Sequence, residues 1–306
     1  MVLPSLTTKY HHAPYPSIDP TRPELSASGK VVVVTGGGTG IGAATALAFV
    51  TAGARAVALL GRRPQPLQES KSQIQSAYAC AEILAFPLDV TDEAAVGDCF
   101  ASLAHRYRGI DVCVNAAAYL SDQGTVAAGP VSEFWKAFEV NVKGGFIVAQ
   151  HFLRNRSRDG AVLIGINSLI AHLPASVVEQ CPASYASSKI ALAKLYEYVA
   201  SENPGVRCYS LHPGVVETEM AAKSDAMAPP QKDNPFLPRD EASLPGQFCV
   251  WLSSKLGAVI PSGRFLWSNW DVDELAAMST ELKNDPVTLT MTLPGWPFPL
   301  PSPGNT

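Results

Sequence analysis

A tyrosine and a lysine four positions apart, Tyr185 and Lys189 in "PASYASSKIALAKLYEYVA", are the residues whose types and spacing could do chemistry. Residues four apart share one face of a helix, and this stretch has a helical pattern. A positive charge beside a phenol, such as this ammonium, favours the phenolate and acts to lower the tyrosine pKa from about 10. The alternative is a packed tyrosine and a solvated lysine on a core helix.

A glycine-rich turn follows the first apolar run of the chain. In "VVVVTGGGTGIGAATAL", Gly36, Gly40 and Gly42 stand between a predicted strand and a predicted helix. Glycines at such a turn let backbone amides approach a pyrophosphate, which lies against the positive end of the helix. The position of the turn favours a dinucleotide site over a plain tight turn.

The end of the second predicted strand indicates which dinucleotide is bound. An acidic residue at this point accepts from the ribose 2′-hydroxyl of NAD, whereas a basic residue suits a 2′-phosphate. Here "ALLGRRP" offers Arg62 and Arg63 and no carboxylate, which favours NADP(H) over NAD(H). The alternative is that both arginines only solvate a loop. Further on, Asp89 either accepts from an adenine amino group or caps the next helix, for which Thr91 and Asp92 are better placed.

Strands that are apolar throughout alternate with amphipathic helices along most of the chain. This pattern predicts an α/β fold of the Rossmann type, a doubly wound parallel sheet of about seven strands with helices on both faces, in a single domain. The expected strands cover 30–36, 56–61, 82–90, 110–118, 160–168, 206–214 and 263–268. The expected helices cover 41–53, 66–79, 92–108, about 131–155, the segment that holds Tyr185, and 241–257.

Three segments fall outside this alternation. We expect an N-terminal leader at 1–28, a main domain at 29–270 and a C-terminal extension at 271–306 that packs on the domain. Within the domain, residues 219–246 are rich in proline and have little periodicity, which predicts a mobile loop or lid.

Composition excludes several classes of partner. A net charge of -4 over 306 residues, with no basic run longer than a pair, makes nucleic acid an unexpected partner. The six cysteines lack metal-site spacing and indicate a reducing compartment. No secretory signal or membrane span is evident, so we expect a cytoplasmic protein with no membrane partner. His11 and His12 have no further nearby ligands, and no metal is expected.

Seven motifs occur together in a fixed order: "TGGGTGIG", "LDV", "VNAAA", "NVKGG", "INS", "YASSK" and "HPGVVET". Their order and spacing resemble those of the short-chain dehydrogenase/reductase superfamily, in its single-domain branch, over about Gly29 to Trp270. The ending "GRFLWSNWDVDELAAM" is similar to that of members from filamentous fungi, many of which modify natural products.

The resemblance implies a role for each matching residue. Tyr185 would be the general acid/base, Lys189 its electrostatic partner, Ser168 the group that orients the substrate oxygen, and Asn141 the holder of a proton-relay water. The backbone of Val215 would bond the nicotinamide carboxamide and Thr218 would add a hydroxyl. The full set implied for the cofactor is Gly36, Thr39, Gly40, Ile41, Gly42, Arg62, Arg63, Asp89, Val90, Asn115, Ala117, Tyr185, Lys189, Pro213, Gly214, Val215 and Thr218.

Two departures from the family pattern concern the pocket. The usual Asn-Asn-Ala-Gly is here Asn115 followed by three alanines, which alters one wall of the nicotinamide pocket. The interval from Ser168 to Tyr185 is longer than typical by a few residues, and the extra loop lies over the substrate side.

The implied function is an NADP(H)-dependent oxidoreductase that interconverts a ketone and a secondary alcohol, in natural-product metabolism. The alternatives are a cofactor-binding scaffold or regulator, and a redox-neutral isomerase or cyclase. The family also implies a homodimer or homotetramer. Apolar residues in or near the lid and tail suggest an apolar substrate, with ordinary packing as the alternative; they are Met220, Met227, Phe236, Trp251, Trp267 and Trp296.

Overall fold

Seven parallel strands form one sheet. Most of these strands are apolar runs whose side chains are buried on both faces of the sheet, as a parallel sheet covered by helices requires. The computed structural model describes residues 5–79, 81–122, 124–158, 160–177, 181–227 and 238–293. The strand order is β3-β2-β1-β4-β5-β6-β7, which confirms the predicted doubly wound sheet. The strands are β1 (Val31–Thr35), β2 (Ala56–Gly61), β3 (Glu82–Pro87), β4 (Val112–Asn115), β5 (Ala161–Ile166), β6 (Val206–His212) and β7 (Phe265–Trp267).

Two helical layers cover the sheet. Val32 and Val34 of β1 point into a core shared with α1 (Gly40–Thr51), α2 (Pro64–Ala77) and α8 (Ser243–Ser253). Val31 and Val33 point into the opposite core, whose helices are α3 (Glu93–Tyr107), α5 (Gly144–Asn155) and α6 (Ala183–Glu202). The alternation of one strand between two cores follows from the period of two in a β-strand.

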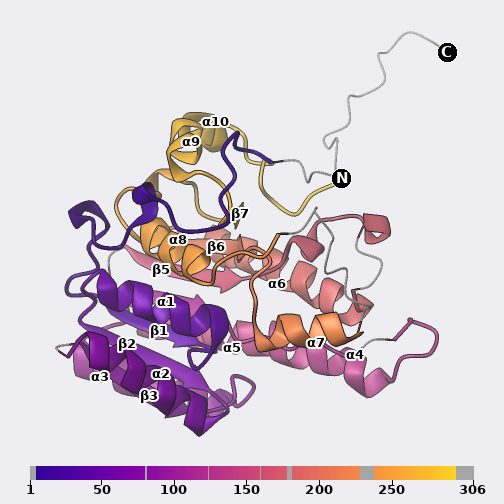
Figure 1. Ribbon diagram of the computed structural model, residues 1–306, viewed down its shortest axis with the longest axis horizontal. Coiled ribbons are helices and arrows are strands. Elements are labelled where there is room, and N and C mark those ends of the chain that lie inside the picture. Colours follow the sequence, from indigo (N-terminus) through magenta and orange to yellow (C-terminus); the bar gives the residue numbers. More distant parts are fainter. Residues whose placement is uncertain are drawn as a thin grey trace.

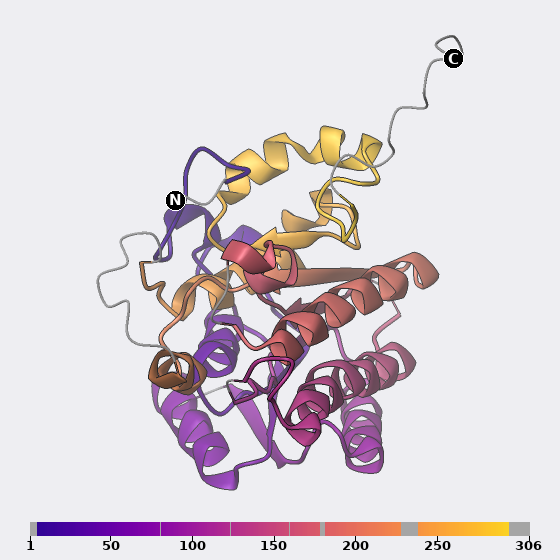
Figure 2. The same ribbon diagram turned by 90° about the vertical axis from the view of Figure 1, so that its right-hand side faces the viewer.

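The long helix expected at 131–155 is continuous but changes its winding in the middle. It consists of α4 (Val131–Phe138), a π-helical turn η3 (Glu139–Lys143) and α5. Figure 2 shows α6 lying alongside this long helix. A π turn adds one residue to the helical repeat and so changes which side chains face inward. Asn141, which lies in that turn, is buried.

The first part of the segment 219–246, where we expected a loop or lid, is helical, and its last part overlaps the helix that we expected at 241–257. Helix α7 covers Glu219–Met227, and α8 already begins at Ser243. The sequence before the first proline is rich in helix formers, and Pro245 falls in the first turn of α8, where proline is tolerated. Residues 228–237, including Phe236, lie outside the described residues, as does Trp296.

The segment expected as a leader is part of the folded core. Two short 3-10 helices, η1 (Pro16–Ile18) and η2 (Pro23–Leu25), bury Ile18 and Leu25 in the core that holds α8. Figure 1 shows this first segment beside α9 (Val272–Ala277) and α10 (Ser279–Asn284). The two ends of the described chain therefore cover the same region of the molecule.

Three further findings concern sequence features. In the part of the chain that the structure describes, no helix has the length and apolarity needed to cross a bilayer. Among the same residues no group of three or more metal-ligating side chains comes together. The described cysteines are not joined by disulfides; they are Cys99, Cys113, Cys181, Cys208 and Cys249.

Candidate active site

Tyr185 and Lys189 lie one turn apart at the start of α6, and both side chains are buried. Tyr185 is 8% exposed and Lys189 is 2% exposed, which excludes a solvated lysine. The Lys189 ammonium lies 5.5 Å from the centre of the Tyr185 ring. It donates a hydrogen bond of 2.9 Å to the carbonyl oxygen of Ile166, the last residue of β5. The structure thus brings together the pair that the sequence singled out.

Burial favours the neutral form of both side chains and shifts both pKa values accordingly. Desolvation lowers the pKa of Lys189 to about 8. Desolvation also raises the pKa of Tyr185 above its ordinary value, with a smaller contribution from Cys181. We expected two positive charges, Lys189 and an oxidised nicotinamide ring, to lower the tyrosine pKa; Lys189 alone does not offset the desolvation. A second positive charge is needed to favour the phenolate.

Ser168 lies just beyond β5, and a buried neighbour ties it to the tyrosine helix. Asn167 accepts a hydrogen bond from the Ser168 amide at 2.9 Å and donates to the carbonyl oxygen of Lys189 at 3.1 Å. The half-buried Ser168 hydroxyl begins the 3-10 helix η4 (Leu169–Ala171), where it accepts from the Ile170 amide at 3.4 Å. Sequence reasoning missed Asn167; a buried amide directly after an apolar strand was the available signal.

Asn141 connects the loop after β4 to the same helix. Its side chain accepts from the Tyr119 amide at 2.7 Å and donates to the Tyr119 carbonyl oxygen at 3.0 Å. It also donates to the Ser188 hydroxyl at 2.9 Å, and Ser188 donates to the Tyr185 carbonyl oxygen at 2.8 Å. These bonds exclude a merely solvated asparagine. Both amide hydrogens are used, so the water-holding role stays a prediction.

The glycine turn has the backbone that its sequence predicts. Gly36 and Gly40 have positive φ values of 67° and 52°, a conformation that favours glycine. A Cβ at Gly42 would collide with the carbonyl oxygen of Gly36, so the turn closes tightly on the start of α1. Thr218, far away in sequence, lies beside this turn, because a Cβ at Gly40 would come within 2.9 Å of its methyl group. Thr39 caps α1 without a side-chain bond, and Ile41 follows in its first turn.

Asn115 fixes the end of β4 against β1 and α6. It accepts from the Thr35 hydroxyl at 2.7 Å and donates to the Tyr196 hydroxyl at 3.1 Å. Thr35 in turn accepts from the Ala117 amide at 3.0 Å. The chain after β4 is therefore held against the glycine turn, where Ala116 and Ala117 pack on Gly36.

The two arginines after β2 lie at the surface with different partners. Arg62 is 59% exposed, and its Nε lies 4.0 Å from a carboxylate oxygen of Asp89. Arg63 donates to Glu219 of α7 at 2.8 Å. Exposed pairs of this kind contribute only about 0 to 1 kcal/mol, so either arginine can change its partner easily.

Asp89 and Val90 shape the loop after β3. The other carboxylate oxygen of Asp89 accepts from the amide and hydroxyl of Thr91 at 2.9 and 2.8 Å. Asp92 is the residue that caps α3, where it accepts from the Ala95 amide at 3.0 Å. Val90 packs against Gly144 at the beginning of α5. The helix-capping alternative for Asp89 is therefore excluded.

The loop after β6 is held by a residue that sequence reasoning missed. Pro213 and Gly214 are buried, and Gly214 has a φ of 87°. Asp240 accepts from the Val215 amide at 2.5 Å, and its own amide donates to the Val215 carbonyl oxygen at 2.9 Å. The predicted bond between the Val215 amide and a carboxamide therefore stays a prediction, because this amide already has a partner.

Helix α7 lies over the catalytic pair. The Tyr185 hydroxyl is 3.9 Å from the Met220 sulfur. Lys223 donates to the carbonyl oxygen of Leu120 at 2.7 Å and pairs with Asp122 at 2.8 Å. These contacts attach α7 to the loop after β4. A thioether is a weak acceptor, so Met220 does little to stabilise a phenolate.

Two tryptophans expected near the substrate belong instead to the core. Trp251 and Trp267 are 2% and 3% exposed. The Trp267 indole donates to His172 at 3.0 Å, which anchors the long loop after Ser168 to β7. Of the apolar residues named for the substrate that the structure describes, Met220 is the one with a recorded contact to the Tyr185 hydroxyl.

Comparisons with known proteins show the family to which the chain belongs. Residues 30–229 match the family model described as short chain dehydrogenase. A short chain dehydrogenase/reductase from Claviceps purpurea is 32% identical over 295 residues, covering 95% of this chain and 95% of that protein. The short chain dehydrogenase/reductase nsrO from Aspergillus novofumigatus is 31% identical over 297 residues, covering 95% and 97%. These relatives confirm the predicted resemblance to fungal members.

Solved structures share the fold. The crystal structure of a dehydrogenase/reductase from Sinorhizobium meliloti 1021 superposes with a TM-score of 0.70 at 26% identity. The superposition covers 80% of this chain and 95% of that chain.

Burial of Lys189 predicts a pH-dependent gain of stability when its charge is removed. The folded pKa is about 8 and the ordinary value is 10.5, so between these values the unfolded chain binds more protons and stability rises with pH. Below pH 8 the buried charge destabilises the fold. The substitution Lys189→Met also removes the hydrogen-bond donor to the Ile166 carbonyl oxygen, which offsets part of the gain. We therefore expect Lys189→Met to raise the free energy of unfolding at pH 7 by about 2 kcal/mol.

Urea unfolding from pH 7 to 10 checks this, and the gain should shrink across that window. Lys194→Met is the control, because Lys194 is a half-exposed lysine on the same helix. A Lys189→Met protein that is less stable than wild type at every pH would contradict the argument.

Proposed function

The chain belongs to the short-chain dehydrogenase family and is an oxidoreductase acting on CH-OH groups, and on this premise we propose an NADP(H)-dependent interconversion of a ketone and a secondary alcohol. Tyr185 is the proposed acid/base. The observation that carries the proposal is the buried Tyr185–Lys189 pair beside Ser168 at the carboxyl end of β5, where doubly wound sheets bind ligands.

The residues of the glycine turn fit a dinucleotide. Close approach of backbone at Gly36 and Gly42, with the amino terminus of the twelve-residue helix α1 behind it, suits a pyrophosphate. Thr218 and the loop after β6 would meet the nicotinamide end, and Arg62 would meet a 2′-phosphate. Bound there, the nicotinamide would supply or accept the hydride.

Reduction of a ketone needs a proton donor at the carbonyl oxygen. The raised pKa of Tyr185 keeps its phenol protonated at neutral pH, which is the form that donates. The Ser168 hydroxyl would share the same oxygen and hold it toward Tyr185. As the phenol loses its proton, the Lys189 ammonium stabilises the phenolate across the short distance between them.

The same pKa argument separates the two directions. Oxidation of an alcohol needs the phenolate as base, and Lys189 alone does not overcome the desolvation of Tyr185. The additional positive charge of an oxidised nicotinamide would favour the phenolate. A buried ammonium destabilises the fold and would bring no benefit to a protein that only binds the cofactor. The alternative of a cofactor-binding scaffold or regulator is therefore not favoured.

Substitution of the acid/base tests the mechanism. We expect Tyr185→Phe to lower NADPH turnover with apolar ketones at least about 100-fold, because the proton donor is lost. Its NADPH dissociation constant should stay within a factor of about two, since the ring and its packing remain. Tyr198→Phe is the matched control on the same helix, where Tyr198 is exposed. Undiminished turnover by Tyr185→Phe would exclude this role.

The preference for NADP(H) depends on the arginines. We expect Arg62→Ala to weaken NADPH binding about tenfold or more and NADH binding little, because only NADPH offers a phosphate to a guanidinium. Calorimetric titration measures both constants. Arg106→Ala is the control: Arg106 is similarly exposed and pairs with Glu82 at the opposite end of β3. Equal weakening of both cofactors by Arg62→Ala would show that Arg62 does not read the phosphate.

An exposed apolar face supports the homodimer among the expected assemblies. Large apolar side chains project to the surface from α4, α5 and α6, namely Trp135, Phe146, Ile190 and Tyr198. Trp135 and Phe146 line the same surface hollow, and exposed apolar side chains that gather in this way are typical of an association site. We propose that two copies pair through this face.

Light scattering with size-exclusion chromatography tests the dimer. Trp135→Glu should shift the protein to monomer, because a carboxylate would be buried at the contact. Leu47→Glu, an exposed leucine on α1, is the control and should leave the assembly unchanged. A wild-type monomer at micromolar concentration would overturn the proposal.

A further inference from the structure

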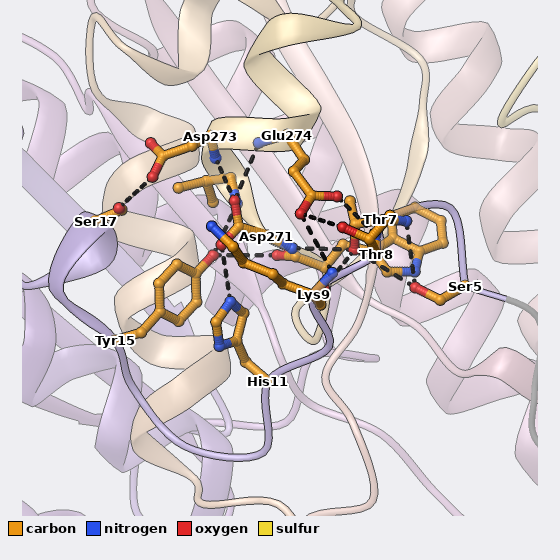
Figure 3. Close-up of polar contacts among 12 residues, drawn as sticks. Ser5, Thr7, Thr8, Lys9, His11, Tyr15, Ser17, Asp271, Asp273 and Glu274 are labelled. Atoms are coloured by element: carbon orange, nitrogen blue, oxygen red, sulfur yellow. Dashed lines mark hydrogen bonds and ion pairs between the residues drawn. The ribbon is translucent and has the colours of Figure 1, made fainter.

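Residues 7–17, which we call the strap, bind the chain end that follows β7. Thr8 bonds through its amide and hydroxyl to the Glu274 carboxylate at 2.6 and 2.7 Å. The Tyr15 hydroxyl donates to the Trp270 carbonyl oxygen and accepts from the Val272 amide at 2.9 Å. Figure 3 shows these side chains converging on the start of α9. The strap is therefore fastened along its length by side-chain and main-chain bonds.

Two adjacent histidines of the strap bind two different carboxylates. His11 donates from Nε2 to Asp271 at 2.9 Å, and Asp271 also caps α9. His12 donates from Nδ1 to Asp240 at 2.6 Å. Because a carboxylate only accepts, the hydrogen in each pair belongs to the histidine. The first contact is confined to the ends of the chain, whereas the second reaches the segment before α8.

Asp240 links the strap to the loop after β6. One carboxylate oxygen accepts from His12 and from the Asn269 amide group at 3.0 Å. The other oxygen accepts from the Val215 amide at 2.5 Å. The Asp240 side chain is 2% exposed, and among the described residues His12 is its one ion-pair partner. A buried carboxylate depends strongly on such donors.

The shape of the loop depends on this carboxylate. Gly214 has a φ of 87°, and a Cβ there would collide with the Asp240 carboxylate. Asp240 also donates its amide to the Val215 carbonyl oxygen, so both peptide groups of Val215 are fixed by one residue. The same loop carries Thr218, which lies beside the glycine turn. Movement of Asp240 would therefore also move Thr218.

We propose that Asp240 and His12 are positioning residues for the nicotinamide end of the cofactor site, and that the strap is a functional part of that site. This inference rests on the proposed role of the loop from Pro213 to Thr218 in binding the cofactor. His12 holds the carboxylate, the carboxylate holds Val215, and the loop presents its remaining groups to the nicotinamide. Among the described residues, neither His12 nor Asp240 makes a hydrogen bond or ion pair with Arg62 or Asp89, which lie at the adenosine end.

Calorimetric titration with NADPH and with 2′,5′-ADP, which lacks the nicotinamide, separates the two ends. We expect His12→Leu to weaken NADPH binding about tenfold through loss of a charge-assisted hydrogen bond and to leave 2′,5′-ADP binding unchanged. His12→Asn should restore NADPH binding, because its side-chain amide can replace the Nδ1 donor. Asp240→Asn, which keeps the side-chain shape, should weaken NADPH binding in the same way.

His11→Leu is the matched control, because it removes the neighbouring bond of the strap and keeps the main-chain pairing of His11 with Asn269. It should leave the affinity for both ligands unchanged. Equal effects of the two leucine variants on NADPH would overturn the inference. Tighter NADPH binding by His12→Leu or Asp240→Asn would also overturn it, since Asp240 would then compete with the cofactor for Val215. Wild-type protein that binds neither ligand would instead overturn the proposed function.

Discussion

The buried ammonium of Lys189 is the constraint on which the rest of the structure depends. An uncompensated charge in a protein interior is strongly unfavourable, so its donors need fixed acceptors. The Ile166 carbonyl oxygen is one such acceptor, and it is presented by the last residue of β5. α6 must therefore lie close against the sheet. Gly165 permits this approach, because a Cβ there would collide with the ring of Tyr196 on α6.

The polar bonds around α6 follow from the same requirement. Asn167 ties the end of β5 to the Lys189 main chain, and Asn115 ties β4 to Tyr196. Asn141 reaches the helix from the neighbouring π-helical turn through Ser188. Three asparagines from three different elements thus fix one helix. Fully bonded buried networks of this kind hold a single arrangement of side chains.

The fold and the catalytic pair could be predicted from sequence because both have local signals. Val31 to Val34 form an unbroken apolar run, and Tyr185 and Lys189 are one helical turn apart. Asp240 had no such signal, because its partner Val215 is 25 residues away and its segment is rich in proline. For Trp251 and Trp267 the sequence left substrate contact and ordinary packing open, because composition alone does not give burial; both side chains are packed in the core. The desolvation that raises the pKa of Tyr185 was not predicted, because it depends on packing that no spacing reveals.

The burial of Ile18 and Leu25 also bears on where this domain begins. The family match starts at residue 30, twelve residues after Ile18. A chain cut at that boundary would lose these two large buried apolar side chains, each contributing about 1.5 to 3 kcal/mol. A typical domain has only about 5 to 15 kcal/mol of stability, so this loss would expose the apolar side of α8 and favour aggregation. The folding unit is therefore longer than the segment that the family model matches.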